Sequence, residues 1–316
     1  MHVRRISIIV AALALACGGG RRSPSVEAPA GPEAISLLGV PLHAIRDSAG
    51  LIARADAELA ETPDNVTAII NAGIARSSAR RFNAAIAMFT HGIEKFPTEA
   101  RLYRFRGHRY LSLRRFDDAV RDLERAVALD STNYDIAYHL ALAYYLTQRY
   151  ADAVAAIDKC MAFAENPKWQ AVEEARINPI WYRSCMSLKT DDDGRAAMLD
   201  WRYRALRRAG KQADARRLAR AVREGWRVRD NAPYYRALLF YRGIRDETST
   251  LDSLSASGEL AFVTGAYGIA NWHLMEGDTS RARAVFERIV GGDQWPAFGF
   301  IAAEVDLARM RADTTR

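Results

Sequence analysis

Histidines are the first candidates for acid–base or metal chemistry, and their spacing favours neither. The six are His2, His43, His91, His108, His139 and His273. None belongs to an H-E-x-x-H zinc motif, and none lies near a pair of cysteines. The sequence also lacks a glycine-rich phosphate loop and a G-x-S-x-G nucleophile motif. We therefore predict no catalytic residues, no metal site and no cofactor, so that the chain is not an enzyme.

Carboxylates gather in one stretch, residues 165–195. Glu173, Glu174 and the triplet Asp191, Asp192 and Asp193 would serve an enzyme, or the accessory subunit of one, that acts on cell-wall polymers. The alternative is that the triplet begins a helix, because acidic side chains favour a helix N-terminus. We favour the helix start, since no rigid strand or loop presents a visible partner for these acids.

Two cysteines, Cys160 and Cys185, could form a disulfide in an oxidising compartment. If they lie on adjacent helices, the bond would clamp the irregular stretch between them. The alternative is that both are small buried residues, because Cys160 occupies a position where a helix packs closely against its neighbour.

Cationic residues are concentrated between residues 195 and 229, in a chain of net charge +7. Arg204, Arg207, Arg208 and Lys211 share one side of a helix by their spacing of three and four residues. This basic patch could bind anionic lipid headgroups, a polyanion or an acidic protein; the alternative is an ordinary solvated surface. Few aromatic residues stand among the arginines, so we predict no nucleic-acid partner.

Residues 1–17 have the pattern of an export signal. Two arginines precede an apolar run from Ile6 to Ala16, which is too short to span a bilayer and suits the core of a signal peptide. The run ends at Cys17. Residues 18–33 are rich in glycine, serine, proline and alanine, which is typical of a flexible tether.

The end of this signal, Leu13 to Cys17, resembles a bacterial lipoprotein signal, in which the cysteine is lipidated and becomes the new N-terminus. Ala14 stands where that family usually has leucine. The A-x-A pattern of Ala14 to Ala16 also fits ordinary secretory cleavage, which would release a secreted or soluble periplasmic protein. We favour lipidation of Cys17, because a tether follows it directly. The resemblance implies a protein anchored in the envelope of a bacterium and facing the periplasm.

The elements that must carry these side chains repeat along the chain with a period of 34 residues. Equivalent positions hold an aromatic residue, a small residue upstream of it, an apolar residue and a second small residue. They are Phe82, Phe116 and Tyr150; Gly73, Gly107 and Ala141; Phe89, Leu123 and Ile157; and Gly92, Ala126 and Cys160. These residues resemble the tetratricopeptide repeat (TPR), a pair of antiparallel helices per unit. Because one unit cannot bury its apolar face alone, we predict an all-α, right-handed solenoid of stacked helix pairs.

The predicted organisation follows from this register. It comprises a signal peptide (1–17), a tether (18–33), an N-terminal helical segment (34–62), three TPR units (63–166), an irregular helical insertion (167–195), a TPR-like unit (196–229), a degenerate helical pair (230–262), and a TPR-like unit with a C-terminal capping helix (263–316).

A concave groove is the expected binding surface of such an array. By the resemblance, it is lined by first-helix residues Arg101, Arg104, His108, Tyr138, Leu142 and Tyr145. This mixture of cationic, aromatic and apolar groups suits a peptide or helix with an apolar face and an acidic end. The family's carboxylate clamp is not expected, because Ile70 and Ile74 stand where its first lysine and asparagine belong. We therefore predict a scaffold that binds a protein or peptide in the cell envelope; the enzyme and anionic-surface hypotheses remain the alternatives, and the oligomeric state is left open.

Overall fold

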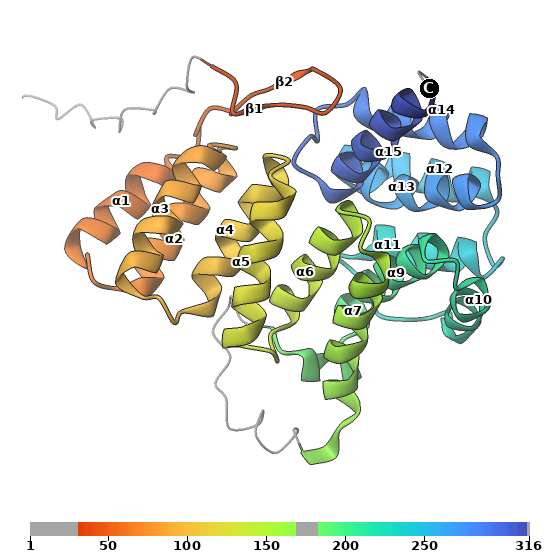
Figure 1. The fold of residues 1–316 in the computed structure, drawn as a ribbon, viewed down its shortest axis with the longest axis horizontal. Helices are drawn as coiled ribbons and strands as arrows, with labels where there is room; N and C mark the ends of the chain where they lie inside the picture. The colour runs from red at the N-terminus through yellow and green to blue at the C-terminus, as the bar shows by residue number, and fades with distance from the viewer. Residues whose placement is uncertain (1–30, 169–182, 315–316) are drawn as a thin grey trace, which may run out of the picture.

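The structure is a computed structural model that describes residues 31–168 and 183–314, and this part of the chain is predominantly helical. Its N-terminal half is a row of helices in which each contacts the next (Figure 1). These are α1 (Leu51–Glu61), α2 (Val66–Ser78), α3 (Phe82–Lys95), α4 (Ala100–Ser112), α5 (Phe116–Leu129), α6 (Tyr134–Leu146) and α7 (Tyr150–Glu165). The helices α2 to α7 form the three helix pairs predicted for residues 63–166.

The C-terminal half contains a second series of helices. These are α9 (Asp192–Arg208), α10 (Gln212–Ala221), α11 (Ala232–Tyr241), α12 (Glu247–Ala256), α13 (Glu259–Met275), α14 (Thr279–Val290) and α15 (Phe298–Thr314). The fold is an all-α solenoid, as the sequence predicted. None of the helices in the described ranges has the length and apolarity needed to cross a bilayer.

Close helix packing explains the repeated small residues. A Cβ atom added to Gly73 would lie 2.2 Å from Phe89, and one added to Gly107 would lie 2.8 Å from Leu123. In the first two units, the first helix can therefore approach the second closely only because Gly73 and Gly107 carry no side chain. Phe82, at the start of α3, is buried as the repeat predicts.

The turn inside each N-terminal helix pair has a left-handed residue at an equivalent position. Arg80, Arg114 and Gln148 have φ of 54°, 62° and 64°, and they follow one another at the repeat spacing of 34 residues. Two corresponding turns in the C-terminal half use glycine, at Gly210 and Gly277. Left-handed backbone is unfavourable for residues with a Cβ. Other contacts of the fold must therefore offset this strain at Arg80, Arg114 and Gln148.

A β-hairpin replaces part of the predicted N-terminal helical segment. Strands β1 (Ala34–Ile35) and β2 (Pro41–Leu42) pair antiparallel, and α1 begins only at Leu51. Within the predicted helical segment 34–62, the helix was expected from Ala44 to Glu61, and this expectation is wrong before Leu51. Gly39 makes the turn with φ of 83°, and the Ser36 hydroxyl accepts hydrogen bonds from two backbone amides of that turn. A glycine turn with a local side-chain acceptor competes directly with a helix.

The insertion between the two halves is tied to the start of α6. A 3₁₀ helix, η1 (Cys185–Lys189), follows an isolated β-bridge between Asn133 and Ser184. A disulfide joins Cys160 on α7 to Cys185, with a Cα–Cα distance of 5.2 Å. The predicted Cys160–Cys185 bond is thus present in the structure, and it fixes η1 against α7. Residues 169–182 of the predicted insertion lie outside the described residues.

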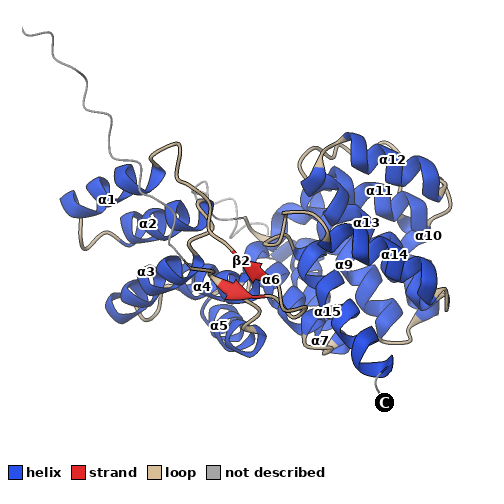
Figure 2. Cartoon of the chain, turned by 90° about the horizontal axis from the view of Figure 1, so that it is seen from above, coloured by secondary structure: helices blue, strands red, loops and turns tan. Residues whose placement is uncertain are grey.

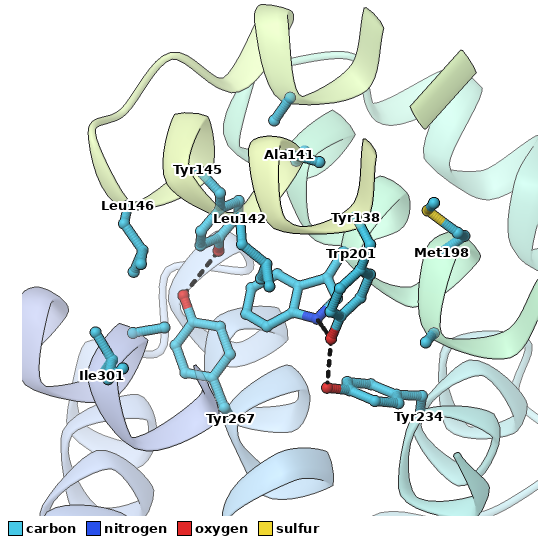
Figure 3. Packing of buried hydrophobic residues seen from close by; sticks show 14 of the residues in the cluster. Tyr138, Ala141, Leu142, Tyr145, Leu146, Met198, Trp201, Tyr234, Tyr267 and Ile301 are labelled. Atoms are coloured by element: carbon cyan, nitrogen blue, oxygen red, sulfur yellow. Dashed lines mark hydrogen bonds between the residues drawn. The ribbon is translucent and has the colours of Figure 1, made fainter. Parts of the chain in front are cut away.

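The C-terminal half folds back onto the inner face of the N-terminal row (Figure 3). Tyr145 and Tyr267 share a hydrogen bond of 2.7 Å between their hydroxyls, and Tyr138 and Tyr234 share one of 2.8 Å. Trp201 donates its indole N–H to the Tyr138 hydroxyl at 3.2 Å. The hydroxyls of buried tyrosines thus find their partners across this contact, so the two halves share one core.

The far ends of the chain also meet. The hairpin runs across toward α15 (Figures 1 and 2), and the Leu37 amide donates a hydrogen bond to the Glu304 carboxylate. Arg114, from the left-handed turn before α5, forms an ion pair with the same carboxylate, and both side chains are almost fully buried. The rings of Phe82 and Trp295 pack edge to face at 5.2 Å. The C-terminal segment is therefore fastened to the first two repeat units.

Candidate functional site

A cavity of about 980 Å³ remains where the two halves do not touch. One side consists of the inner surfaces of α2, α4 and α6. The other side comes from residues 183–191, the start of α9, the loop at 230–231 and Phe298 at the beginning of α15. This volume is at the upper end of the range for ligand-binding cavities, so it could hold several residues of a peptide.

Two guanidinium groups from α4 face this cavity. Arg104 reaches Asp135 at 3.3 Å, but its Nε has no hydrogen-bond partner. Arg109 lies over the Phe82 ring at 4.9 Å, and no carboxylate of the described residues is within ion-pair distance of it. Burial, assisted by the nearby charge of Arg104, lowers the pKa of Arg109 to about 9. A partly buried cation without a counter-ion carries a desolvation cost, and an anionic ligand group would relieve it.

A pair of imidazoles lies beside the arginines. The rings of His108 and His139 are 4.4 Å apart between centroids, and His139 contacts the carbonyl of Asp135 through Nδ1. Burial, followed by the charges of Arg109 and Arg104 respectively, lowers the pKa of His108 and of His139 well below 6.5. Both imidazoles are therefore neutral near pH 7. Phe298 packs on His108 at 5.0 Å and completes an aromatic floor.

The opposite wall carries carboxylates whose oxygen atoms accept hydrogen bonds from backbone amides. Asp191 accepts hydrogen bonds from the amides of Asp193 and Gly194, as the cap of α9. Asp193 accepts the amides of Arg229 and Asn231. The aspartate triplet therefore begins a helix and anchors a neighbouring loop, as the helix-start interpretation predicted. The cavity is consequently cationic on its α4 side and acidic on its α9 side.

A second cavity, of about 550 Å³, continues from the first. The two share Asp230, Asn231 and Phe298 in their linings. The second is lined further by Pro233, Leu260 and other residues of α11, α13 and the segment before α15. A ligand longer than one side chain can therefore extend from the arginines past Phe298.

The residues predicted to line the groove separate into three groups. Arg104, His108 and Tyr138 line the large cavity, whereas the Arg101 guanidinium is paired with Glu99, its nearest charged neighbour, at 2.8 Å. Leu142 and Tyr145 are buried in the contact with the C-terminal half. The prediction of an open groove is wrong for these last two residues, because the chain's own C-terminal helices cover them.

Sequence reasoning missed Arg109, His139 and Phe298. His139 follows His108 by 31 residues, three fewer than the repeat, so the period gave no reason to pair them. Phe298 comes from the far end of the chain, and no local pattern marks it.

Three of the four residues of the predicted basic patch are mainly buried and ion-paired. The pairs are Arg204–Asp200 at 2.5 Å, Arg207–Glu276 at 2.7 Å and Arg208–Asp306 at 2.6 Å. Lys211 is exposed. The expectation of an exposed patch is therefore wrong at residues 204–208, because α9 is packed between other helices and carboxylates of the same fold neutralise its arginines. The anionic-surface hypothesis therefore loses these three arginines, whereas Arg216, Arg217, Arg220, Arg223, Arg227 and Arg229 of the region 195–229 are exposed.

The remaining site predictions fall on other parts of the chain. Cys17 and the glutamates Glu173 and Glu174 lie outside the described residues. Among residues 31–168 and 183–314, no group of three histidine, cysteine, aspartate or glutamate side chains could hold a metal ion.

Comparison with known proteins finds the repeat in the middle of the N-terminal half. Residues 106–160, from α4 to α7, match the sequence profile of the tetratricopeptide repeat. No curated protein matches the chain by sequence.

Several solved structures resemble the fold. The MamA protein is 18% identical over 62% of this chain and 82% of its own, with a TM-score of 0.40. YrrB, a TPR protein described as having an unusual peptide-binding site, is 14% identical over 75% of this chain and 91% of its own, with a TM-score of 0.42. A TPR protein from Parabacteroides merdae ATCC 43184 is 14% identical over 79% of this chain and 90% of its own, with a TM-score of 0.46.

Proposed function

We propose that this protein is an exported scaffold, anchored by a lipid on Cys17 in the envelope of a bacterium, which binds a protein or peptide partner in the cavity beside α4. Stacked helix pairs generally serve as non-catalytic binding surfaces. Here the inner surface is partly covered by the C-terminal helices, so the partner would bind in the space that they leave open.

The observation that carries the proposal is the unpaired guanidinium of Arg109 at the wall of a large cavity. Carboxylates pair with guanidinium groups through two parallel hydrogen bonds. The aromatic floor formed by His108 and Phe298 would pack against an apolar group next to that carboxylate. A peptide segment with an acidic residue beside an apolar one therefore fits this wall best.

Export is supported by the disulfide between Cys160 and Cys185, because such bonds persist in oxidising compartments. Mass spectrometry of the mature N-terminus tests the anchor. An acylated Cys17 at the N-terminus is expected, and an unmodified cysteine would exclude lipidation.

Site-specific photo-crosslinking tests the binding site. A photoreactive amino acid placed at Ser78, which is exposed at the cavity rim, should capture a discrete partner protein in intact cells. The same residue placed at Arg217, a highly exposed position on α10, should not capture that partner.

A charge-matched pair of variants then tests the guanidinium itself. Arg109→Gln should abolish the crosslink from position 78, because it removes the unpaired cation. Arg121→Gln removes the same charge from an exposed site on α5 and should leave the crosslink unchanged. Equal crosslinking in both variants would refute the assignment of Arg109.

A further inference from the structure

Exposed aliphatic side chains are concentrated at the start of the described chain. Among the described residues, the large hydrophobic side chains with the greatest exposure are Ile35, Leu37, Val40, Ile45, Leu51 and Leu260. All except Leu260 fall between residues 35 and 51, with exposed fractions from 37% to 56%. Exposed apolar side chains that gather in one segment often mark an interaction site.

The hairpin register shows why Ile35 faces outward. Ala34 pairs with Leu42 and Ile35 pairs with Pro41. Neighbouring residues of a strand point to opposite faces, and Leu42 is buried against the core. Ile35 and Pro41 therefore share the outer face. Leu37 and Val40 flank the turn, and Val40 and Ile45 border a cavity of about 310 Å³ between the hairpin and the segment that contains Trp295. We call Ile35, Leu37, Val40 and Ile45 the hairpin face.

The hairpin face is held rigidly in this orientation. The Glu33 amide bonds the Leu42 carbonyl at 2.7 Å, and the Ser36 amide bonds the Val40 carbonyl at 2.8 Å. The Leu37 amide is fastened to the buried carboxylate of Glu304. These bonds hold the apolar side chains in the solvent, so their exposure is a property of the fold.

The charge around the hairpin face suits an anionic lipid surface. Residues 34–46 contain no aspartate or glutamate, whereas His43 and Arg46 are both exposed within this segment. A cation near a membrane surface is attracted to anionic lipids. Apolar side chains beside a cation such as Arg46 are typical of an interfacial membrane contact.

Chain length links this surface to the proposed lipid anchor. Sixteen residues lie between Cys17 and Ala34. As a flexible coil, a linker of that length has an end-to-end distance of about 20–25 Å, and its extended limit is about 60 Å. The hairpin is thus the folded element closest along the chain to the acylated cysteine, within easy reach of the bilayer.

We propose that the hairpin face rests on the lipid bilayer and forms a second membrane contact beside the anchor. This inference depends on the lipid-anchor part of the proposed function and is independent of the cavity. Stable attachment through lipid chains commonly needs a second signal, and the hairpin face would supply it.

Fluorescent labelling of the full chain tests the inference. The protein is produced in a bacterial host, purified in its lipidated form and incorporated into vesicles of phosphatidylcholine and phosphatidylglycerol. An environment-sensitive dye is attached to Val40→Cys, or to Leu260→Cys as the matched control, since these positions are 56% and 58% exposed. The native cysteines do not compete, because Cys160 and Cys185 are buried in a disulfide and the proposed acyl group blocks Cys17.

The dye at position 40 should shift its emission to the blue in vesicles and lose intensity when nitroxide-labelled lipids are included. The dye at position 260 should show neither change. Two dyes with the same water-like emission would overturn the inference. Energy transfer between differently labelled copies at position 40, without lipid quenching, would assign the hairpin face to a second copy of the chain and overturn it as well.

The mass of the mature N-terminus shows, in a separate measurement, whether the lipid anchor is absent. An unmodified Cys17 would remove the premise of the inference and overturn it together with the anchor. An acylated Cys17 with an aqueous dye at position 40 would overturn only the hairpin contact.

Discussion

The left-handed turns offer a matched pair of substitutions, Arg114→Gly and Gln148→Gly. Both positions have the same backbone conformation, with φ of 62° and 64°. Glycine relieves about 1–2 kcal/mol of left-handed strain at each, although its greater freedom in the unfolded chain offsets part of that gain. Gln148 is exposed, so we expect Gln148→Gly to change the free energy of unfolding by no more than about 1 kcal/mol.

Arg114→Gly has an additional effect, because it removes the cation that neutralises Glu304. The carboxylate of Glu304 is completely buried, and removal of one partner from a buried ion pair costs about 3–5 kcal/mol. After about 1 kcal/mol of relieved strain is subtracted, Arg114→Gly should lower the free energy of unfolding by roughly 2–4 kcal/mol.

Urea unfolding followed by circular dichroism measures both variants against the parent protein. The reasoning is refuted if Arg114→Gly and Gln148→Gly unfold at the same urea concentration. A third variant, Arg114→Met with Glu304→Met, controls for the loss of side-chain volume. It should recover much of the lost stability, because apolar residues of similar size often replace a buried ion pair without cost.

Three further perturbations test other parts of the structure. Replacing both Cys160 and Cys185 by alanine should cost about 3.5 kcal/mol, the loop-closure entropy for a sequence separation of 25, and urea unfolding of this variant should no longer respond to a reductant. Gly73→Ala should destabilise the chain measurably, because its Cβ would lie 2.2 Å from Phe89; a thermal midpoint equal to that of the parent would contradict the packing. The pKa of His139 is depressed in the folded state, so the unfolded state binds more protons below pH 6.5 and stability should fall as pH drops through that value. His139→Gln should make the thermal midpoint between pH 7 and pH 5 less dependent on pH, and an identical slope in both proteins would show that His139 titrates normally.

Repetition in the sequence was sufficient to predict the N-terminal helix pairs. Gly73, Gly107 and the aromatic Phe82 recur in one register because each makes the same local contact, so three copies reinforce one another. The hairpin had no such support. Its turn depends on Gly39 and the Ser36 hydroxyl, and a single short turn is easily read as the start of a helix.

The contact between the two halves could not be predicted from spacing, because it joins residues such as Tyr145 and Tyr267 that are 122 positions apart. One signal was nevertheless present. Almost every residue of α6 is buried, and its sequence is apolar on all sides, which is typical of a helix surrounded by protein. An open groove would have required a polar inner face on α6.

The basic patch failed for a related physical reason. Helical spacing correctly placed Arg204 and Arg208 close together on α9, but spacing does not reveal whether a helix surface meets water. Asp306, the partner of Arg208, is 98 residues away. The same limitation hid Phe298 from the prediction of the cavity.

The bond from Leu37 to Glu304 connects positions 267 residues apart, and it has a consequence for how the chain can evolve. In a linear helical array, a unit can be duplicated or lost with little effect on distant units, because each contacts only its neighbours. Here an extra pair of helices between the hairpin and α15 would pull Glu304 away from Arg114 and Leu37. We therefore expect the number of units to be fixed among proteins that share these contacts of Glu304 with Leu37 and Arg114. Changes in length should be confined to the loops.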